Sequence, residues 1–282
     1  MACTPEKKQE ADYSQYVNPM IGTDFTGNTY PGAQVPFGMV QLSPDNGLPG
    51  WDRISGYFYP DTTIAGFSHT HLSGTGAGDL YDISFMPVTR PYKEAPAPLG
   101  IYSTFSHNDE AASAGYYRVL LKDYNINVEL TATERCGIQR YTFPEAEASV
   151  FLNLKKAMNW DFTLDSKIEV VDSTTIRGYR LSQGWSPLQH VYFETRFSKP
   201  FVACHMDTTS IVTKEKGWIG TAYVARFDFN TKKDEEILVT TGISGVSMEG
   251  AGKNLRAEAP KDDFDYYQAQ ASANWNRQLS KI

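Results

Sequence analysis

The sequence predicts an all-β protein, built as a large two-sheet antiparallel sandwich or as a barrel. Three observations support this prediction. Segments of alternating apolar and polar residues recur along the chain, Gly, Asn and Asp separate these segments, and helical periodicity is confined to the C-terminal end. With 282 residues, 41% of them hydrophobic, the chain is long enough to bury a sizeable core as one large domain.

The first 15 residues are expected to form a flexible, polar tether. This tether begins MACTPEKKQE, and its Cys3 follows two residues that we interpret as the replacement of a removed signal peptide. A cysteine in this position is typical of the lipid-bearing residue of a mature bacterial lipoprotein. The alternative is an ordinary disordered terminus in which Cys3 has no such role.

Composition argues against two classes of partner. The net charge is −7 and no run of Lys and Arg is present, whereas nucleic-acid binding needs clustered positive charge. No apolar run approaches the roughly 18 residues that a membrane-spanning helix requires, so we expect membrane contact only through a lipid anchor. The remaining cysteines, Cys136 and Cys204, lack the CxxC spacing of zinc or redox sites.

Turns are expected to dominate residues 16–45. Proline and glycine are dense in NPMIGT, TGNTYPGA and VPFGMVQLSPD, which excludes a helix and limits any strand to short pieces.

Residues 50–82 are expected to build the functional site. This stretch contains Trp51, two closely spaced histidines and many glycines and aspartates, and its apolar residues follow neither the helical nor the strand period. Glycine-rich turns of this kind bring the backbone close to a ligand and fix the side chains around it.

The histidines His69 and His71 leave three interpretations open. A metal site could combine them with Asp79 or Asp82 in a two-His, one-carboxylate set. They could instead donate hydrogen bonds to ligand hydroxyls, or serve as satisfied structural histidines. The parts also suit a sugar, with Trp51 as a stacking platform. The candidate hydroxyl partners are Asp45, Asp52, His69, His71 and Asp79.

A short strand is expected at residues 83–88, and ordinary β structure from Tyr116 onward. In residues 126–131, for example, Ile126, Val128 and Leu130 alternate with polar residues, so one face is buried. Val191, Phe193, Thr195 and Phe197 share one face in the same way. The predicted strands are residues 83–88, 116–121, 126–131, 140–143, 149–154, 167–171, 174–181, 190–197, 222–229 and 236–244.

Only residues 262–282 are predicted to form a helix, because their apolar residues recur at intervals of three or four. Asp262 or Asp263 is the expected N-cap. Its apolar stripe consists of Phe264, Tyr267, Ala271, Trp275, Leu279 and Ile282. We expect this stripe to be exposed in the chain alone. An uncovered apolar face usually marks a missing partner, and the abrupt end after Ile282 suggests that further chain follows.

Several motifs resemble the N-terminal domain of glycoside hydrolase family 92, the calcium-dependent, inverting exo-α-mannosidases typical of gut Bacteroidetes. The similarity spans nearly the whole chain after Tyr16. The motifs are YPGA (30–33), PFGMVQLSPD (36–45), SGY (55–57), GFSHTHLSGTG (66–76), ELTAT (129–133), YF (192–193), FSKPF (197–201) and ANWN (273–276). At Arg53 and Ile54 the family more often has Trp and Cys, which implies a difference at the edge of the pocket.

The resemblance implies a β-supersandwich over residues 16–260, after the tether of residues 1–15. Residues 261–282 would begin a helical linker to an (α/α)₆ barrel. That barrel, absent here, would carry both catalytic carboxylates and most of the calcium ligands, so no catalytic residue and no metal ligand is assigned in this chain. The substrate-binding residues expected by resemblance are Trp51, Asp52, His69, His71, Gly74, Thr75 and Asp79.

Two functions are therefore weighed. The first is the pocket-contributing domain of an exo-α-mannosidase, acting on α-1,2-linked mannose in glycans and inactive without the barrel. The second is a stand-alone carbohydrate-binding domain of a surface lipoprotein. Either would be a periplasmic or outer-membrane lipoprotein anchored through Cys3, with α-mannoside glycans as ligands.

Overall fold

A computed structural model describes residues 11–74, 76–155, 159–213 and 218–281, without the side chains of residues 208–222. The predictions made for Cys3, Thr75 and Ile282 lie outside the described residues.

The sandwich prediction is confirmed. Fourteen strands join in the order β1-β3-β4-β12-β17-β13-β14-β15-β18-β11-β10-β9-β8, with β16 on the other edge of β17. Their bounds are β1 Ser43–Asp45, β3 Gly66–Ser68, β4 Ser84–Thr89, β8 Glu110–Ser113, β9 Tyr116–Leu121, β10 Ile126–Ala132, β11 Cys136–Phe143, β12 Ala146–Asn153, β13 Phe162–Val170, β14 Thr175–Gln183, β15 Gln189–Phe197, β16 Ala203–Thr213, β17 Trp218–Thr231 and β18 Glu235–Ser244. Two small sheets pair β2 (Thr63–Ile64) with β7 (Ser103–Thr104), and β5 (Glu94–Ala95) with β6 (Gly100–Ile101).

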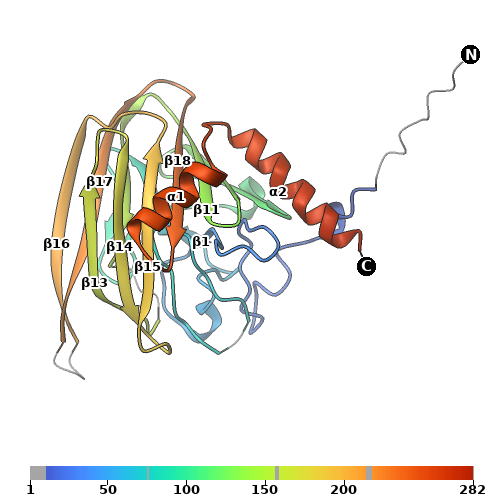
Figure 1. Ribbon diagram of the computed structural model, residues 1–282, viewed down its shortest axis with the longest axis horizontal. Helices are drawn as coiled ribbons and strands as arrows, with labels where there is room; N and C mark the ends of the chain where they lie inside the picture. The colour runs from blue at the N-terminus through green and yellow to red at the C-terminus, as the bar shows by residue number, and fades with distance from the viewer. Residues whose placement is uncertain (1–10, 75, 156–158, 214–217, 282) are drawn as a thin grey trace, which may run out of the picture.

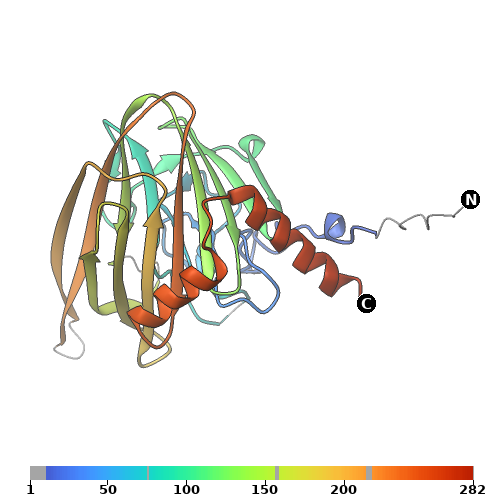
Figure 2. The ribbon, with the colours of Figure 1, turned by 45° about the horizontal axis from the view of Figure 1, so that its top comes forward.

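The long sheet folds over on itself into two layers (Figures 1 and 2). The turning point is the pair β17 and β13, which share a single parallel bridge between Thr221 and Asp165, whereas the other strand pairs are antiparallel. Phe197 on β15 contacts Phe85 on β4 and Phe227 on β17, with ring centroids 6.4 and 5.2 Å apart. These aromatic contacts between the two halves place the core between the layers.

Most of the predicted strands are present, and their buried faces are those that the alternation indicated. On β15, Val191, Phe193, Thr195 and Phe197 are all buried. The edge strand β16 was not predicted, because its residues are largely polar. The short strands β2, β3, β5, β6, β7 and β8, of two to four residues each, were not predicted either.

A second helix, α1 (Met248–Glu258), was also missed. Its sequence MEGAGKNLRAE contains two glycines and few apolar residues, so the stripe is too weak to be recognised. Tertiary packing decides its structure. A Cβ at Gly242 on β18 would lie 2.6 Å from the backbone carbonyl oxygen of Ala251, so the helix can approach the sheet this closely only with glycine there. Ser247 caps it by accepting a hydrogen bond from the Gly250 N–H.

The predicted C-terminal helix is α2 (Phe264–Leu279), and Asp263 caps it by accepting from the Tyr266 N–H at 3.0 Å. The expectation that its apolar stripe is exposed is wrong for the first part of the helix. Phe264, Tyr267 and Ala271 are buried against β9, β10 and β11, and the Trp275 indole N–H donates to the Gln34 carbonyl. The sheet of this same chain therefore covers the first part of the stripe, whereas Trp275 and Leu279 are half-buried.

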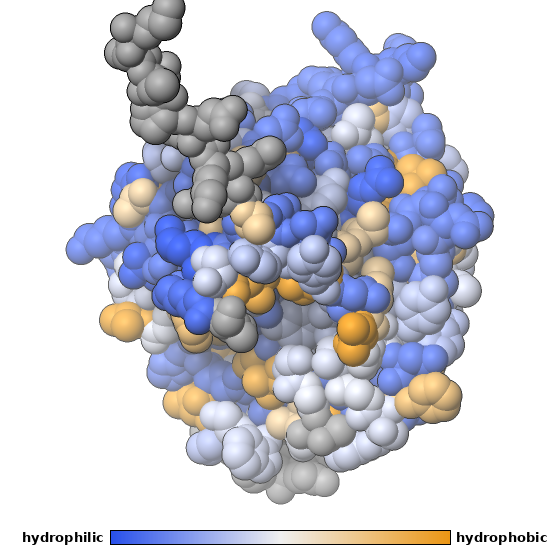
Figure 3. Space-filling view, turned by 90° about the vertical axis from the view of Figure 1, so that its right-hand side faces the viewer, coloured by the Kyte–Doolittle hydropathy of each residue, from blue (hydrophilic) through white to orange (hydrophobic). Residues whose placement is uncertain are grey.

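The end of the molecule that carries α2 faces the viewer in Figure 3, where hydrophobic residues form separate patches among hydrophilic ones. No helix among the described residues is long and apolar enough to cross a membrane.

Candidate functional site

The stretch of residues 50–82 follows β1 and runs through a short 3₁₀ helix, η2 (Trp51–Arg53), and the strands β2 and β3. Trp51 stands at its outer end with 53% of its surface exposed. Its ring stacks on that of the exposed Trp160, with centroids 6.3 Å apart and planes 26° from parallel. The structure therefore has a pair of exposed indoles at this position, where the sequence analysis had named Trp51 alone.

Asn159 ties this pair to the loops around it. Its side-chain oxygen accepts a hydrogen bond from the Gly50 N–H at 2.9 Å, which holds Trp51 next in the chain. Gly78 lies against the same side chain, and a Cβ there would be 2.7 Å from the Asn159 Cβ. Three segments distant in sequence therefore meet at one amide.

Asp52 is half-buried on η2, beside the indole pair. The neighbouring Arg53 is held by two hydrogen bonds to Asp61, of 2.6 and 2.5 Å, and its guanidinium lies 4.6 Å from the centre of the Phe58 ring. Donating these hydrogen bonds to the Asp61 carboxylate raises the pKa of Arg53 above its ordinary value, so the cation is fixed in place.

His71 is buried and fully engaged within the protein. Its Nδ1 lies 2.7 Å from the Gln41 carbonyl, and its Nε2 lies 3.0 Å from Asp45 Oδ1 and 3.1 Å from Ser68 Oγ. Gly56 has a φ of +92°, and a Cβ there would approach both the imidazole and the Asp45 carboxylate within 3.0 Å. The geometry favours the structural interpretation of this histidine.

His69 is also buried, in a less polar place. Its Nδ1 lies 2.8 Å from the Ile83 carbonyl, whereas its Nε2 has no partner. Burial lowers the pKa of His69 to about 4, which keeps the ring neutral near pH 7. Neither histidine reaches the surface here, so substrate contact by His69 and His71 stays a prediction.

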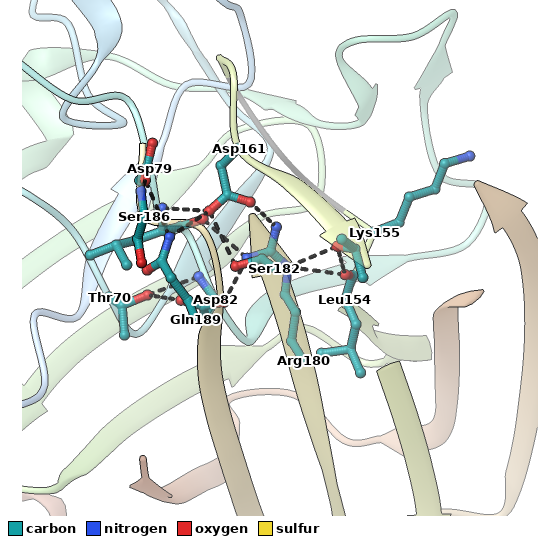
Figure 4. Close-up of polar contacts among 12 residues, drawn as sticks. Thr70, Asp79, Asp82, Leu154, Lys155, Asp161, Arg180, Ser182, Ser186 and Gln189 are labelled. Atoms are coloured by element: carbon teal, nitrogen blue, oxygen red, sulfur yellow. Dashed lines mark hydrogen bonds and ion pairs between the residues drawn. The ribbon is translucent and has the colours of Figure 1, made fainter. Parts of the chain in front are cut away.

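Behind the two histidines lies a charged cluster that is closed to solvent. Arg180 on β14 bonds Asp82 at 2.6 Å and Asp161 at 2.7 Å, and Asp82 also accepts from the Thr70 hydroxyl (Figure 4). Burial opposes the charge of Arg180, but its two carboxylate partners outweigh burial and hold its pKa above the ordinary value. Thr163 and the Leu154 carbonyl accept further hydrogen bonds from it.

Asp79 is buried at the edge of this cluster. Its carboxylate accepts hydrogen bonds from the backbone N–H groups of Trp185 and Ser186, at 3.0 and 3.1 Å, and from the Gln189 amide at 3.3 Å. The same amide reaches Asp161, so the hairpin between β14 and β15 is attached to the charged cluster (Figure 4). The role of Asp79 that the geometry favours is to hold that hairpin.

Gly74 lies in a half-buried loop with open space around it. Its φ is +94°, and its N–H donates to the Asn28 carbonyl at 2.6 Å. This glycine therefore fixes a left-handed turn beside the buried histidines.

The residues described do not suit a metal centre at the histidines. Among them, no three His, Cys, Asp or Glu side chains are grouped to hold an ion. Asp79 and Asp82, the two carboxylates considered for that role, are occupied by backbone N–H groups and by Arg180. The described part of the chain thus offers no cluster to the calcium that the resemblance implies, and no chemical step is derived through it.

Sequence reasoning missed Asn159, Trp160, Asp161, Arg180 and Trp185. One of them was detectable. Arg180 occupies an inward-facing position of β14, whose neighbouring inward residues are Ile176, Gly178 and Ser182. A cation on the buried side of a strand requires buried anions.

A cavity of about 450 Å³ lies elsewhere, under the hairpin of β5 and β6. None of the predicted site residues lines it, and its wall is largely apolar, including Met86, Leu99 and Phe151. Because the polar and aromatic groups converge around residues 50–82, we take that region as the candidate site.

Comparison with known proteins agrees with this organisation. The family model described as "Glycosyl hydrolase family 92 N-terminal domain" matches residues 16–244. An "Uncharacterized secreted glycosidase" of Arthroderma benhamiae is 28% identical in an alignment 308 residues long. The alignment covers 97% of this chain and 39% of that protein.

Solved structures are similar as well. A family 92 α-mannosidase from Bacteroides thetaiotaomicron, in complex with mannoimidazole, superposes with a TM-score of 0.87 at 37% identity, covering 96% of this chain and 37% of that one. A family 92 inverting mannosidase from the same species gives a TM-score of 0.79 at 26% identity, covering 96% and 36%. The chain therefore spans little more than a third of the length of these relatives.

Proposed function

Because this chain belongs to glycosyl hydrolase family 92, we propose that it is the N-terminal domain of a calcium-dependent, inverting exo-α-mannosidase. In this proposal it contributes residues to the mannose pocket, while an (α/α)₆ domain supplies the catalytic acid and base. The substrate is an α-1,2-linked mannose at the end of a glycan. The similar structures are of an α-mannosidase and of an inverting mannosidase, which supports this reaction class.

The observation that carries the proposal is the stacked pair Trp51 and Trp160. Exposed indoles held in a fixed position present flat apolar faces of the kind that pack against the C–H groups of a sugar ring. Asp52, half-buried on the same 3₁₀ helix, is the hydroxyl partner that this surface offers. The buried cluster around Arg180 supports the site without touching the sugar, because it is closed to solvent.

We further propose that the chain alone is inactive. The hydrolysis of a glycosidic bond needs one carboxyl as acid and another as base or nucleophile. Around the candidate site, Asp45, Asp79, Asp82 and Asp161 are all bonded within the protein. Asp52 alone cannot serve as both acid and base, and in this proposal the second domain supplies the acidic pair.

The test is complementation. The purified chain is mixed with a separately made (α/α)₆ domain, with calcium or with a chelator, and mannose release from α-1,2-mannobiose is measured. Activity only in the mixture with calcium supports the proposal. Mannose release by the chain alone would contradict it. Replacing the substrate by α-1,3- and α-1,6-mannobiose tests the linkage.

The alternative, a stand-alone carbohydrate-binding domain, is favoured by one observation. Phe264, Tyr267 and Ala271 of the α2 stripe are buried against the sheet of the chain itself, so this part of the helix does not require a further domain to cover it. Mannoside binding by the chain, together with no mannose release by the mixture of the two domains, would support this alternative.

Secretion is part of the proposal, as one relative is named a secreted glycosidase. We propose a periplasmic or outer-membrane lipoprotein, anchored through Cys3. Mass spectrometry of the protein isolated from its natural membrane tests this, since an unmodified Cys3 thiol would exclude the anchor.

A further inference from the structure

The hairpin between β14 and β15 carries an exposed aromatic residue that the proposed function does not use. Trp185 lies in the connecting turn, residues 184–188, with 82% of its surface exposed, and Leu188 on the same turn is 51% exposed. Burying an indole contributes to stability only if water is removed from it, so a tryptophan this exposed adds little to the fold. Its environment therefore points to contact with a ligand.

The turn is rigid although it lies at the surface. Two successive backbone N–H groups, those of Trp185 and Ser186, are bound by the single buried carboxylate of Asp79. Gly184 is pressed against that carboxylate, since a Cβ there would lie 2.4 Å from Asp79 Oδ1. A backbone held in this way loses little conformational entropy when the turn binds a ligand.

Direct contacts connect this turn to the indole pair. Asp79, which binds the turn, follows Gly78, which packs on Asn159. Asn159 in turn accepts the hydrogen bond from Gly50 that fixes Trp51. The turn that carries Trp185 is thus attached to the proposed mannose site through the short segment of Gly78 and Asp79.

The surface beyond Trp185 has groups that suit a carbohydrate. His190 and Tyr192 follow on β15 and Tyr179 lies opposite on β14, with neighbouring ring centroids 6.2 and 5.9 Å apart. The Tyr179 hydroxyl donates to Asp165 at 3.0 Å. These aromatic rings carry polar atoms at their edges, which is the combination that serves both the C–H faces and the hydroxyls of sugars.

We propose that Trp185 stacks on a sugar of the glycan beyond the mannose held at Trp51 and Trp160, and so sets a preference for longer substrates. This inference rests on the proposed function. Trp185 acts in it as a binding residue and takes no part in bond cleavage.

The first experiment uses the enzyme that carries both domains. Mannose release is compared for an aryl α-mannoside, which has one sugar, and for a linear α-1,2-mannotriose. Trp185→Ala should raise KM for the trisaccharide about tenfold, as loss of a buried aromatic anchor does, and leave the aryl mannoside within about twofold. Trp185→Phe should restore most of the difference.

Val171→Ala is the matched control, because Val171 is an exposed apolar residue at the opposite end of β14 and should affect neither substrate. An equal loss on both substrates for Trp185→Ala would overturn the inference and indicate a structural role. No loss on either would overturn it as well.

A second experiment separates the inference from the proposed function. Binding of the mannotriose to this chain is followed by nuclear magnetic resonance, without any requirement for catalysis. If the two-domain enzyme releases no mannose but the chain binds the trisaccharide through Trp185, the proposed function fails and the inference stands. Binding that is identical in wild type and Trp185→Ala refutes the inference whatever the enzyme does.

Discussion

The inner and outer parts of the stretch of residues 50–82 have similar compositions and opposite environments. At the outer end, Trp51 stacks on Trp160 in contact with solvent. At the inner end, His69 and His71 are buried and bonded to the protein itself. Residues that look equally functional in the sequence are thus divided between a ligand surface and its support.

This division has an energetic consequence. Removing a buried polar group leaves its partner without a hydrogen bond or counter-charge in a medium of low dielectric, which is costly. Removing an exposed indole leaves nothing unpaired. Substitutions at the inner end should therefore change stability, and substitutions at the outer end should change binding.

The largest effect is expected for Arg180→Met. The substitution roughly conserves volume but leaves the buried carboxylates of Asp82 and Asp161 without their cation. Breaking a buried ion pair from one side costs about 3–5 kcal/mol. The free energy of unfolding, measured by denaturant titration, should fall by that amount.

Arg180→Lys is the matched variant, since it keeps the charge and loses the two-sided geometry of the guanidinium, so its loss should be smaller. If Arg180→Met were as stable as the wild type, the cluster would not hold the inner end together, and the proposed division would fail there.

The next effect is a dependence on pH from His69. Its pKa is about 4 in the folded protein against about 6.5 in an unfolded chain, so the unfolded state binds the extra proton first. Stability from the neutral ring is therefore present above pH 6.5 and is lost as the pH falls toward 4, by about 3 kcal/mol.

His69→Asn isolates this contribution, because the Asn amide can donate to the Ile83 carbonyl in place of Nδ1 without titrating. The difference in unfolding free energy between the two proteins should change by that amount between pH 6.5 and 4. Parallel pH profiles would show that His69 is not held neutral by burial.

The layers and strands of this fold were largely predictable from the sequence. Alternation in the β15 segment identified its buried face because one side of that strand packs on the core. The short α1 helix was not predictable, since its few apolar residues and two glycines give no clear stripe, and its packing against β15 and β18 decides its structure. Likewise, whether the α2 stripe is covered depends on where the sheet lies.

The site was predictable only as a region. Residues 50–82 were recognised from their glycines and aromatic residues, but the indole that stacks on Trp51 comes from residue 160 and the cation behind the histidines from residue 180. Local patterns do not contain such pairings, because they are created by chain segments about 100 residues apart. Burial, which separates Trp51 from His71, is likewise a property of the folded chain.

The smallest effect on stability, with a clear effect on binding, is expected at the outer end. Trp51→Ala should change the unfolding free energy by no more than about 0.5 kcal/mol, because the residue is half exposed and buries no polar group. Mannose release by the two-domain enzyme should nevertheless fall about tenfold, in the range of losing one aromatic anchor. Trp160→Ala should have the same effect. In the double variant, the loss of activity, expressed as free energy, should be smaller than the sum of the two single losses, since the rings stack on each other. A large loss of stability for Trp51→Ala, with unaltered turnover of the folded fraction, would instead place Trp51 with the histidines as part of the support.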